Sequence, residues 1–490
     1  MARRNSPVSM SWWMWGLVIG IMNLPGWPEE AGSPASSPDI KPVTGSIILR
    51  NDWIRAEIHP AGGGRVEQMY AHEDPLLWPL SGQEAHEESW LGASLVLYAS
   101  HPLSSTATIG WVSQEEAVCQ PGGRSAVIRS VYERQLKINR EFAVGNLESV
   151  LRVTTTITNP GGAPVVFFPS EAASINTEYA RSGMPNINLY FYSPYSTLEG
   201  SKPFEITLGL VNNPQFAVMP EHSLFIARNA HRIGEIKLTS EKNWFAFQNL
   251  ISHAAIQGGT VCAAEFTFPG VKPEPVRDNL ILHVNGAGEY IGDGKLRFNS
   301  PETAKYMRAT RVLGRVELQP GASFTYVAAW SMTSCEGPIV DVRDGIVFNK
   351  HLVVYLPPNR PGFLNYANLG IPQEGNIGFQ YLGANNEVFK ITEQDGRQKE
   401  HLLTIPLILE ATKEKSRPSR VVPFLPTPIH HFTLVFFSEE QLNAGPGELQ
   451  KIQDAIHSIR MMLVDSKQKP IRVLDEVSGP FPVSTEELQF

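Results

Sequence analysis

The chain has 490 residues, of which 41 are Lys or Arg and 49 are Asp or Glu, so its formal net charge is -8. This acidic balance predicts no nucleic-acid partner and no general attraction to anionic lipid, because both require a basic protein surface. At this length two domains are expected, with enough chain to bury a large core.

Residues 1–35 have the features of an export signal. A positively charged start is followed by an apolar stretch at residues 12–22, which is too short to cross a bilayer comfortably. Ser33 and Ala35 suit the positions before a cleavage site, although Pro34 departs from the pattern, so an uncleaved membrane anchor stays open. No Asn-x-Ser/Thr sequon with an allowed middle residue occurs, which favours a bacterial source. We therefore expect an exported protein, periplasmic or extracellular.

Residues 45–335 alternate with a period of two. In residues 54–58, 151–158 and 204–210, apolar or β-branched side chains occupy every second position, which is typical of half-buried antiparallel strands. Pro-Gly turns, as at residues 160–162, supply the reversals. Because a sheet with one apolar face must bury it against another sheet, this region predicts a mainly β fold, a large antiparallel β-sandwich.

The pattern is interrupted at about residues 336–346, where a domain boundary is predicted. Residues 347–490 contain several short strand patterns and then one helical pattern. The apolar side chains at helical spacing, which predict an amphipathic helix packed on a sheet, are Leu449, Ile452, Ile456, Ile459 and Leu463. This region is predicted to be a smaller α+β domain of unknown role, with a protein partner as one option.

Three stretches of the first region carry motifs of a known family. Residues 51–66 (NDWIRAEIHPAGGGRV) have a strand that ends in Pro and a Gly-Gly-Arg step, and residues 151–160 (LRVTTTITNP) have a strand that ends in Thr-Asn. Residues 318–330 (LQPGASFTYVAAW) have a Pro-Gly turn before a last strand. In order and spacing these stretches resemble the galactose mutarotase-like (aldose epimerase-like) β-sandwich family. The resemblance implies a carbohydrate ligand.

The resemblance also implies a His as general acid and a Glu as general base, which open and close a sugar ring. In the family the His lies shortly after the Thr-Asn strand, but residues 165–179 contain no His. This departure argues against ring epimerisation and favours binding. Glu171, Ser174 and Asn176 are candidates to line a polar pocket there, with Glu171 as a candidate acid or base.

The glycines at residues 62–64 precede Arg65, the first candidate for substrate binding. Glycine permits positive φ and close backbone approach, so the chain is expected to turn sharply and aim Arg65 inward. The planar guanidinium then offers its donors to sugar hydroxyls or a carboxylate. The other interpretation is a simple bulge, with Arg65 solvated or ion-paired at the surface.

Two further groups are candidates. His86, Glu87 and Trp90 combine an imidazole, a carboxylate and an aromatic plane in a predicted loop, which is what sugar recognition requires. A solvated acidic loop is the other interpretation. His283 and Glu289 are a candidate acid and base pair, against the interpretation of a core or rim His and a turn carboxylate.

No cofactor or metal is indicated by the sequence. The cysteines allow at most one disulfide and match no zinc spacing: they are Cys119, Cys262 and Cys335. The leading hypothesis is an exported protein that recognises carbohydrate through the sandwich, with catalysis undecided. The alternative is a structural or assembly protein of the bacterial envelope, in which residues 347–490 bind a protein partner.

Overall fold

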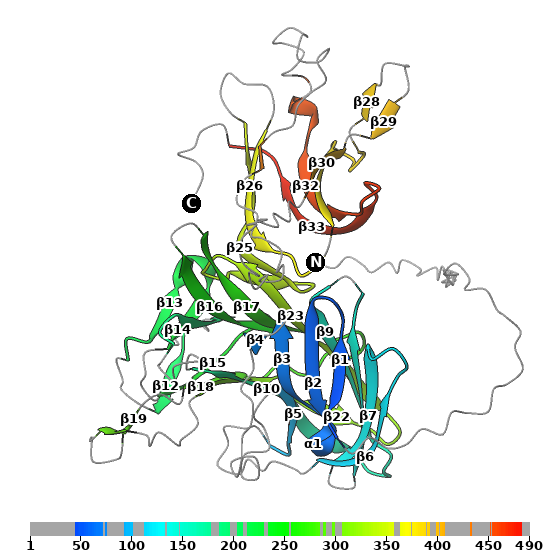
Figure 1. Cartoon of the computed structure of the whole chain (residues 1–490), viewed down its shortest axis with the longest axis vertical. Coiled ribbons are helices and arrows are strands. Elements are labelled where there is room, and N and C mark those ends of the chain that lie inside the picture. Colours follow the sequence, from blue (N-terminus) through cyan, green and yellow to red (C-terminus); the bar gives the residue numbers. More distant parts are fainter. Residues whose placement is uncertain are drawn as a thin grey trace, which may run out of the picture. The chain divides into compact units, whose positions relative to one another are not determined.

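Two large antiparallel sheets form the main part of the fold in the computed structural model (Figure 1). The first sheet has 11 strands in the order β1-β2-β3-β5-β10-β21-β18-β15-β12, with β4 paired to β3 and β22 paired to β10. Its strands are β1 (Ile47–Arg50), β2 (Ile54–His59), β3 (Arg65–Ala71), β4 (Asp74–Pro75), β5 (Ala93–Tyr98), β10 (Val165–Asn176), β12 (Glu205–Leu208), β15 (Gly234–Leu238), β18 (Leu280–Val284), β21 (Tyr306–Val312) and β22 (Val316–Leu318).

The second sheet has 10 strands in the order β13-β14-β11-β16-β17-β23-β9-β8-β7-β6. Its strands are β6 (Val112–Cys119), β7 (Ser125–Tyr132), β8 (Leu136–Val144), β9 (Val150–Thr158), β11 (Leu189–Pro194), β13 (Phe216–Met219), β14 (Leu224–Arg228), β16 (Trp244–His253), β17 (Ile256–Thr267) and β23 (Ser323–Cys335). One hydrophobic cluster takes side chains from both sheets, including Ile58 and Leu282 from the first and Phe142 and Trp330 from the second. The predicted mainly β sandwich is confirmed.

Alternation of burial along the strands follows from this packing. In β2 the side chains of Ile54, Ala56 and Ile58 are buried and their neighbours are partly exposed, as predicted. The predicted strand at residues 204–210 is only partly right, because β12 covers four residues at the edge of its sheet. Leu208 there is 37% exposed, since an edge strand has a neighbour on one side only.

The remaining elements are smaller. Two four-stranded sheets have the orders β24-β25-β26-β31 and β30-β27-β32-β33, and two hairpins are β19-β20 and β28-β29. The strands are β19 (Gly288–Tyr290), β20 (Leu296–Phe298), β24 (Asp341–Arg343), β25 (Ile346–Tyr355), β26 (Leu364–Gly370), β27 (Asn376–Leu382), β28 (Lys390–Thr392), β29 (Gln398–Glu400), β30 (Leu402–Pro406), β31 (Phe432–Thr433), β32 (Ser458–Val464) and β33 (Pro470–Ser478). The short helical turns include α1 (Ala61–Gly64) and the 3-10 turn Pro220–His222, and residues 453–455 are helical as well.

A second hydrophobic cluster joins the outer face of the ten-stranded sheet to the strands that follow it in the chain. It includes Trp244 and Val261 from that sheet, and Phe348, Phe379 and Met461 from the two four-stranded sheets. The cluster thus contains residues from both sides of the predicted boundary at 336–346. The ten-stranded sheet therefore buries apolar side chains on both of its faces where these strands cover it.

The helix predicted from the spacing of Leu449 to Leu463 is wrong over its second half, where β32 (Ser458–Val464) lies instead. This strand pairs with β27 on one side and with β33 on the other. Six of its seven residues are buried, because both of its faces are covered. A strand that is buried on both faces has a continuous apolar run, which periodicity alone does not distinguish from a buried helix.

All of the described residues belong to one compact unit, Pro42–Phe490. The predicted export signal at residues 1–35 lies outside them. No helix among them has the length and apolar character needed to span a membrane. The structure describes residues 45–71, 74–75, 93–100, 112–132, 135–146, 148–177, 186–196, 203–208, 213–229, 234–253, 256–284, 288–290, 296–298, 306–356, 363–373, 375–388, 390–392, 398–400, 402–406, 432–433, 451 and 453–482.

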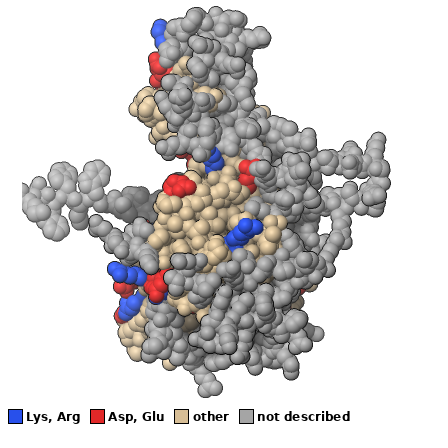
Figure 2. Space-filling view, turned by 90° about the vertical axis from the view of Figure 1, so that its left-hand side faces the viewer, with Lys and Arg blue, Asp and Glu red and all other residues tan. Residues whose placement is uncertain are grey.

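Charged side chains are dispersed on the face of the molecule shown in Figure 2. The described Lys, Arg, Asp and Glu residues there form small separate groups of both signs, with an uncharged area between them. Among the described residues of this face there is no continuous basic patch. The absence of a nucleic-acid partner stays a prediction.

Candidate functional site

Four polar side chains form a row across the outer face of the 11-stranded sheet. In β15, β18, β21 and β10, alternate residues enter the sandwich core, and the residues between them face outward. Glu235 pairs with His283 across β15 and β18, His283 pairs with Arg308 across β18 and β21, and Arg308 pairs with Ser174 across β21 and β10. These four residues are the polar row.

The side chains in the polar row contact one another and an aromatic ring. His283 Nδ1 lies 3.3 Å from Glu235 Oε2, and Thr207 Oγ1 donates to Glu235 Oε1 at 2.8 Å. The Tyr306 ring lies 5.8 Å from the His283 ring, and the Arg308 guanidinium lies 5.6 Å from the Tyr306 ring centre. The side chains of His283 and Glu235 are 17% and 31% exposed. This end of the row is therefore accessible to solvent.

The contacts in the polar row set the charge of Glu235. The hydrogen bond with His283 lowers the pKa of Glu235 most, burial opposes this, and Thr207 and the Arg308 charge lower it further. Glu235 is therefore an ionised acceptor at neutral pH. The row combines this carboxylate with an imidazole and a guanidinium beside an aromatic ring. The polar groups offer acceptors and donors to one ligand, whereas the Tyr306 ring is 5% exposed and packs against them.

Ser174, which faces outward from β10, is fully buried, and its Oγ has no hydrogen-bond partner among the described residues. A buried hydroxyl normally has a partner. Asn176 occupies the next outward position of β10 and pairs with Tyr306 in the register, while its side chain lies outside the description. Both residues belong to the stretch in which a polar pocket was predicted.

His283 has a different carboxylate beside it from the one suggested by the sequence. Its contact is with Glu235 in the neighbouring strand, whereas Glu289 lies in the separate hairpin of β19 and β20, opposite Arg297. The side chain of Glu289 lies outside the description. Glu235 was missed because nothing in the sequence shows that β15 pairs with β18.

Glu171 points into the sandwich core, away from the polar row. Its Oε1 accepts hydrogen bonds from Arg140 Nη2 at 2.9 Å and from the Tyr326 hydroxyl at 2.6 Å, and both Glu171 and Tyr326 are fully buried. Arg140 Nη1 also donates to the carbonyl of Gly64 at 3.0 Å. These are the contacts of an ion pair inside the core. The role of Glu171 as an acid or base stays a prediction.

The glycine run behaves as the sequence suggests. Gly63 and Gly64 have φ angles of 81° and 82°, and a Cβ on Gly64 would lie 2.9 Å from side-chain atoms of Ile128 and of Phe142. These constraints require glycine at position 64, where α1 ends and β3 begins. The short helical turn therefore delivers the chain directly to Arg65.

Arg65 lies on the outer face of the same sheet as the polar row. It precedes Val66, whose side chain is in the sandwich core, so its own side chain faces outward, and the expectation that the glycine run aims Arg65 inward is wrong. It forms an ion pair with Glu67 at 2.8 Å, and its side chain is 12% exposed. Its contact with a substrate stays a prediction. His86, Glu87 and Trp90 lie outside the described residues.

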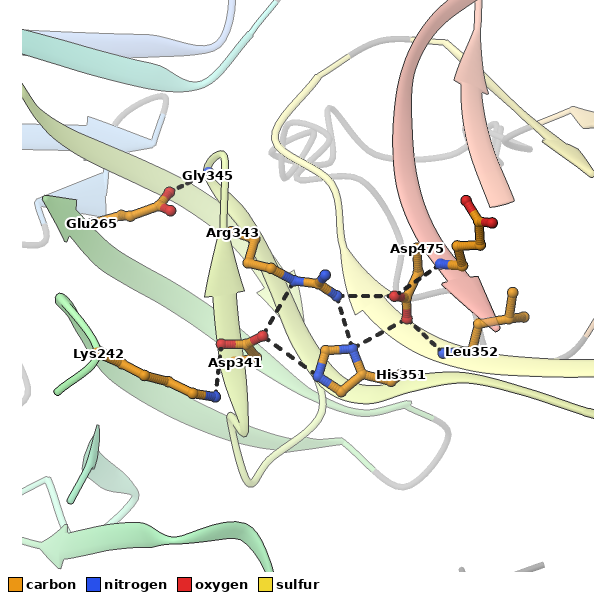
Figure 3. A network of polar contacts seen from close by, with 9 residues as sticks. Lys242, Glu265, Asp341, Arg343, Gly345, His351, Leu352 and Asp475 are labelled. Atoms are coloured by element: carbon orange, nitrogen blue, oxygen red, sulfur yellow. Dashed lines mark hydrogen bonds and ion pairs between the residues drawn. The ribbon is translucent and has the colours of Figure 1, made fainter. Parts of the chain in front are cut away.

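A second polar network connects β24, β25 and β33 (Figure 3). Asp475 accepts a hydrogen bond from Arg343 Nη2 at 3.0 Å and another from the backbone N–H of Leu352 at 2.8 Å. The carboxylate oxygen that accepts from Leu352 also lies 3.1 Å from His351 Nδ1. Asp341 lies on the other side of His351, with 3.5 Å between His351 Nε2 and Asp341 Oδ2. This network ties together strands that are far apart in the sequence.

Burial and hydrogen bonding act in opposite directions on two carboxyl groups of Figure 3. Burial raises the pKa of Asp475, but hydrogen bonds from His351, Leu352 and Arg343 outweigh it and hold the pKa at about 2. Burial raises the pKa of Glu265 to about 7, although the Gly345 N–H donates to it at 3.1 Å. Within the described part of the chain, no group of His, Cys, Asp and Glu residues is arranged to hold a metal ion.

Comparison with known proteins gives neither a matching family model nor a matching curated protein. Solved structures that are similar include a putative aldose 1-epimerase of Escherichia coli, with 11% identity over 59% of this chain and 98% of that one, at a TM-score of 0.36. A galactose mutarotase related enzyme of Lactobacillus acidophilus has 11% identity over 59% and 97%, at 0.35. A GH36 α-galactosidase of Geobacillus stearothermophilus has 10% identity over 59% and 40%, at 0.31. The first two carry the name of the family that the sequence resembles.

Proposed function

We propose that this protein recognises a carbohydrate on the outer face of its 11-stranded sheet. The observation that carries the proposal is the polar row, in which Glu235, His283 and Arg308 lie side by side next to the Tyr306 ring. Sugar hydroxyls require both donors and acceptors. The ionised Glu235 supplies acceptors, Arg308 supplies donors, and the Nε2 of His283 is the ring nitrogen that faces away from Glu235.

The proposal concerns binding and not ring epimerisation. β10 contains no His, and its Glu171 is held by Arg140 and Tyr326 inside the core, where a sugar does not reach it. The polar row nevertheless contains an imidazole beside a carboxylate. Glycan affinity and sugar epimerisation are therefore both measured for the same variants, which shows whether the site binds a sugar without transferring a proton to it.

The test is a glycan array probed with the full chain, followed by titration of each glycan that is retained. We expect the native protein to retain at least one glycan class, and His283→Ala and Arg308→Ala each to weaken its binding by about tenfold or more, which corresponds to one lost charged hydrogen bond. Arg129→Ala is the matched control, because it removes an exposed arginine of the other sheet. It is expected to bind like the native protein.

Two results contradict the proposal. The first is that no glycan is retained by a native protein whose circular dichroism and unfolding transition show that it is folded. The second is that both variants bind as tightly as the control. Arg65→Ala, measured in the same series, tells whether the site extends along the sheet to β3.

We also propose that the protein is exported to the periplasm or beyond it. The support is the sequence of residues 1–35, with its charged start and its apolar stretch. Expression of the chain with and without these residues in a bacterial host, followed by fractionation, tests this. Recovery of both forms in the cytoplasm contradicts it, and recovery of the longer form in the membrane fraction indicates an uncleaved anchor.

A second candidate function, assembly with a protein partner through residues 347–490, is favoured by one feature of β33. This strand lies at the edge of its sheet, and its apolar residues Ile471 and Val473 are 44% and 47% exposed. Ile471→Lys with Val473→Lys is expected to abolish such an assembly and to leave glycan binding unchanged. Sedimentation in a bacterial envelope extract, with and without the substitutions, measures it.

A further inference from the structure

Arg311 is a buried arginine whose hydrogen bonds all end on neutral groups. It lies in β21 on the face opposite to Arg308 and is 1% exposed. Its Nη1 donates to Asn279 Oδ1, and its Nη2 donates to the carbonyl of Ser240 and to Asn243 Oδ1, each at 3.0 Å. Its Nε has no hydrogen-bond partner among the described residues.

Among the described residues, no carboxylate forms an ion pair with Arg311. Glu171 lies opposite Arg311 in the register of β10 and β21, but its ion pair is with Arg140. Burial lowers the pKa of Arg311 to about 9. The guanidinium is therefore still positive at neutral pH. A buried charge costs several kcal/mol unless an opposite charge compensates it.

A cavity of about 390 Å³ lies against this arginine. Its lining includes Arg311 and Asn279, the basic residues Lys272 and Arg277, and one acidic residue, Glu241. Lys272 and Arg277 are exposed, whereas Arg311 is buried. The lining therefore carries more positive than negative charge, and one of its positive charges is shielded from solvent.

The segment that carries Lys272 and Arg277 is fixed to the sandwich. Glu274 and Arg315 exchange backbone hydrogen bonds at 2.9 Å and 2.8 Å, and the Asp278 N–H donates to Thr239 Oγ1 at 2.9 Å. The prolines Pro273 and Pro275 restrict the backbone between these ties. The cavity wall is thus preorganised, which reduces the entropy that binding would cost.

A role in holding the loops together explains only part of the reason for a buried arginine at position 311. The Nη groups of Arg311 join the loops that carry Ser240, Asn243 and Asn279, and a neutral side chain would make some of these bonds without burying a charge. These bonds do not account for the excess of basic residues in the lining of the adjoining cavity. A negatively charged group in the cavity would account for it.

We propose that this cavity binds a small oxyanion group, a carboxylate, sulfate or phosphate, which neutralises Arg311 and contacts Lys272 and Arg277. The N–H groups of Arg311 that its three hydrogen bonds leave over are Nε–H and one on Nη1, and a guanidinium N–H donates well to the oxygens of such groups. The same chemistry is offered by a free inorganic ion and by the carboxylate of an acidic sugar. The site is on the opposite face of β21 from the polar row, so the proposal does not depend on glycan recognition there.

The test uses the full chain and three sodium salts, sulfate, phosphate and glucuronate, at an ionic strength held constant with sodium chloride. Thermal unfolding and isothermal titration are measured for the native protein and for Lys272→Ala with Arg277→Ala, a surface double variant expected to fold. Arg129→Ala is the control for the loss of an exposed arginine on the other sheet. Arg311→Lys, which keeps the charge and loses the guanidinium, is the second variant.

We expect at least one oxyanion to raise the unfolding temperature of the native protein saturably, because a ligand that binds only the folded state stabilises it. The double variant is expected to bind about tenfold more weakly, as for the loss of a charged hydrogen bond, and the control is expected to be unchanged. Binding of glucuronate alone assigns the site to an acidic sugar, and binding of sulfate or phosphate alone assigns it to a free ion.

Two outcomes overturn the proposal: no oxyanion has a saturable effect beyond that of chloride, or the double variant and Arg311→Lys both bind like the native protein. His283→Ala is measured in the same series. It is expected to leave oxyanion binding unchanged, so failure of this site and failure of the glycan site are distinguished.

Discussion

Arg140 and Arg311 lie in the same β-sandwich and are both 1% exposed, but only Arg140 has an ion-pair partner among the described residues. Arg140 lies between the two sheets and forms an ion pair with Glu171 at 2.9 Å. Arg311 hydrogen-bonds to amide and carbonyl oxygens and adjoins a cavity. Between the sheets, the buried charge of Arg140 has a counter-charge in the protein. Beside the cavity, the buried charge of Arg311 has no ion-pair partner among the described residues. The comparison links the missing partner to the cavity.

The Arg140–Glu171 pair is expected to show the largest effect on stability. Glu171→Gln leaves Arg140 buried without a counter-charge, and removal of one partner of a buried ion pair costs about 3 to 5 kcal/mol of unfolding free energy. Urea unfolding of the native and variant chains at pH 7 measures this. A loss below about 1 kcal/mol, the range of exposed pairs, would show that Arg140 tolerates burial alone and would remove the contrast with Arg311.

A second substitution sharpens this measurement. If the cost of Glu171→Gln comes from the uncompensated Arg140, then Arg140→Met with Glu171→Gln is expected to cost less than the sum of the two single variants. Strict additivity would assign the cost of Glu171→Gln to its other contact, the Tyr326 hydroxyl.

The contrast between the two arginines was not predictable from the sequence, although the strands that carry them were. Alternation identifies a strand when one face is buried, as for Ile54 and Ile58 in β2. Alternation also separates Glu171 from Ser174 in β10, but it does not say which of the two faces the core. That depends on the partner strands, which bring Arg140 and Tyr326 to Glu171 from distant parts of the chain.

The same limit applies to the candidate site. His283 was a candidate from its own strand, but Glu235 is 48 positions away and reaches it only because β15 pairs with β18. The failure at β32 has a different cause. Ile459 and Leu463 have the spacing of a helix, and they also belong to an apolar run that is buried on both faces of a strand.

Two acidic groups show the same contrast as the two arginines. Burial dominates the pKa of Glu265, whereas hydrogen bonds from its neighbours dominate the pKa of Asp475. Glu265 has a pKa raised to about 7 by burial, against an ordinary value of 4.5. The unfolded chain loses this proton at lower pH than the folded one. The contribution of Glu265 to stability is therefore complete below pH 4.5 and is lost as the pH rises to 7.

Glu265→Gln removes this titration and is expected to stabilise the protein relative to the native chain at alkaline pH. The gain is expected to grow between pH 4.5 and pH 7 to about 3 kcal/mol at most, since each pKa unit corresponds to about 1.4 kcal/mol. Unfolding midpoints of the two chains at pH 5 and pH 8 measure it. A gain that is equal at both pH values would mean that Glu265 is ionised in the folded protein throughout.

Asp475→Asn is expected to act in the opposite direction. The hydrogen bonds of Asp475 with His351, Leu352 and Arg343 hold its pKa at about 2 against burial, below the ordinary 3.8. Its contribution is present above pH 3.8 and is lost as the pH falls to 2. The variant is expected to be about 2 kcal/mol less stable at pH 7 and no less stable at pH 2, by the same conversion.

The measurement for Asp475 is the difference in unfolding free energy between the two chains along an acid titration. Arg343→Met is a matched variant, because it removes one of the four donors to Asp475, which are Arg343, His351 and the backbone N–H groups of Leu352 and Glu476, and keeps the carboxylate. It is expected to lose less stability than Asp475→Asn. A loss in Asp475→Asn that is independent of pH would assign the effect to packing.

The smallest effect is expected for an ion pair that is compensated and also exposed. Arg129 and Glu116 pair across β7 and β6, with side chains that are 57% and 41% exposed. Water solvates both charges whether or not they meet, so Glu116→Gln is expected to cost less than about 1 kcal/mol.

The stability cost of Glu116→Gln is expected to vanish at high salt, because the charges are open to screening. The stability cost of Glu171→Gln is expected to persist. Urea unfolding of both variants at low and high sodium chloride measures the two costs. Equal salt dependence for the two variants would mean that burial does not protect the Arg140–Glu171 pair from screening, and the distinction between interior and surface charges in this fold would fail.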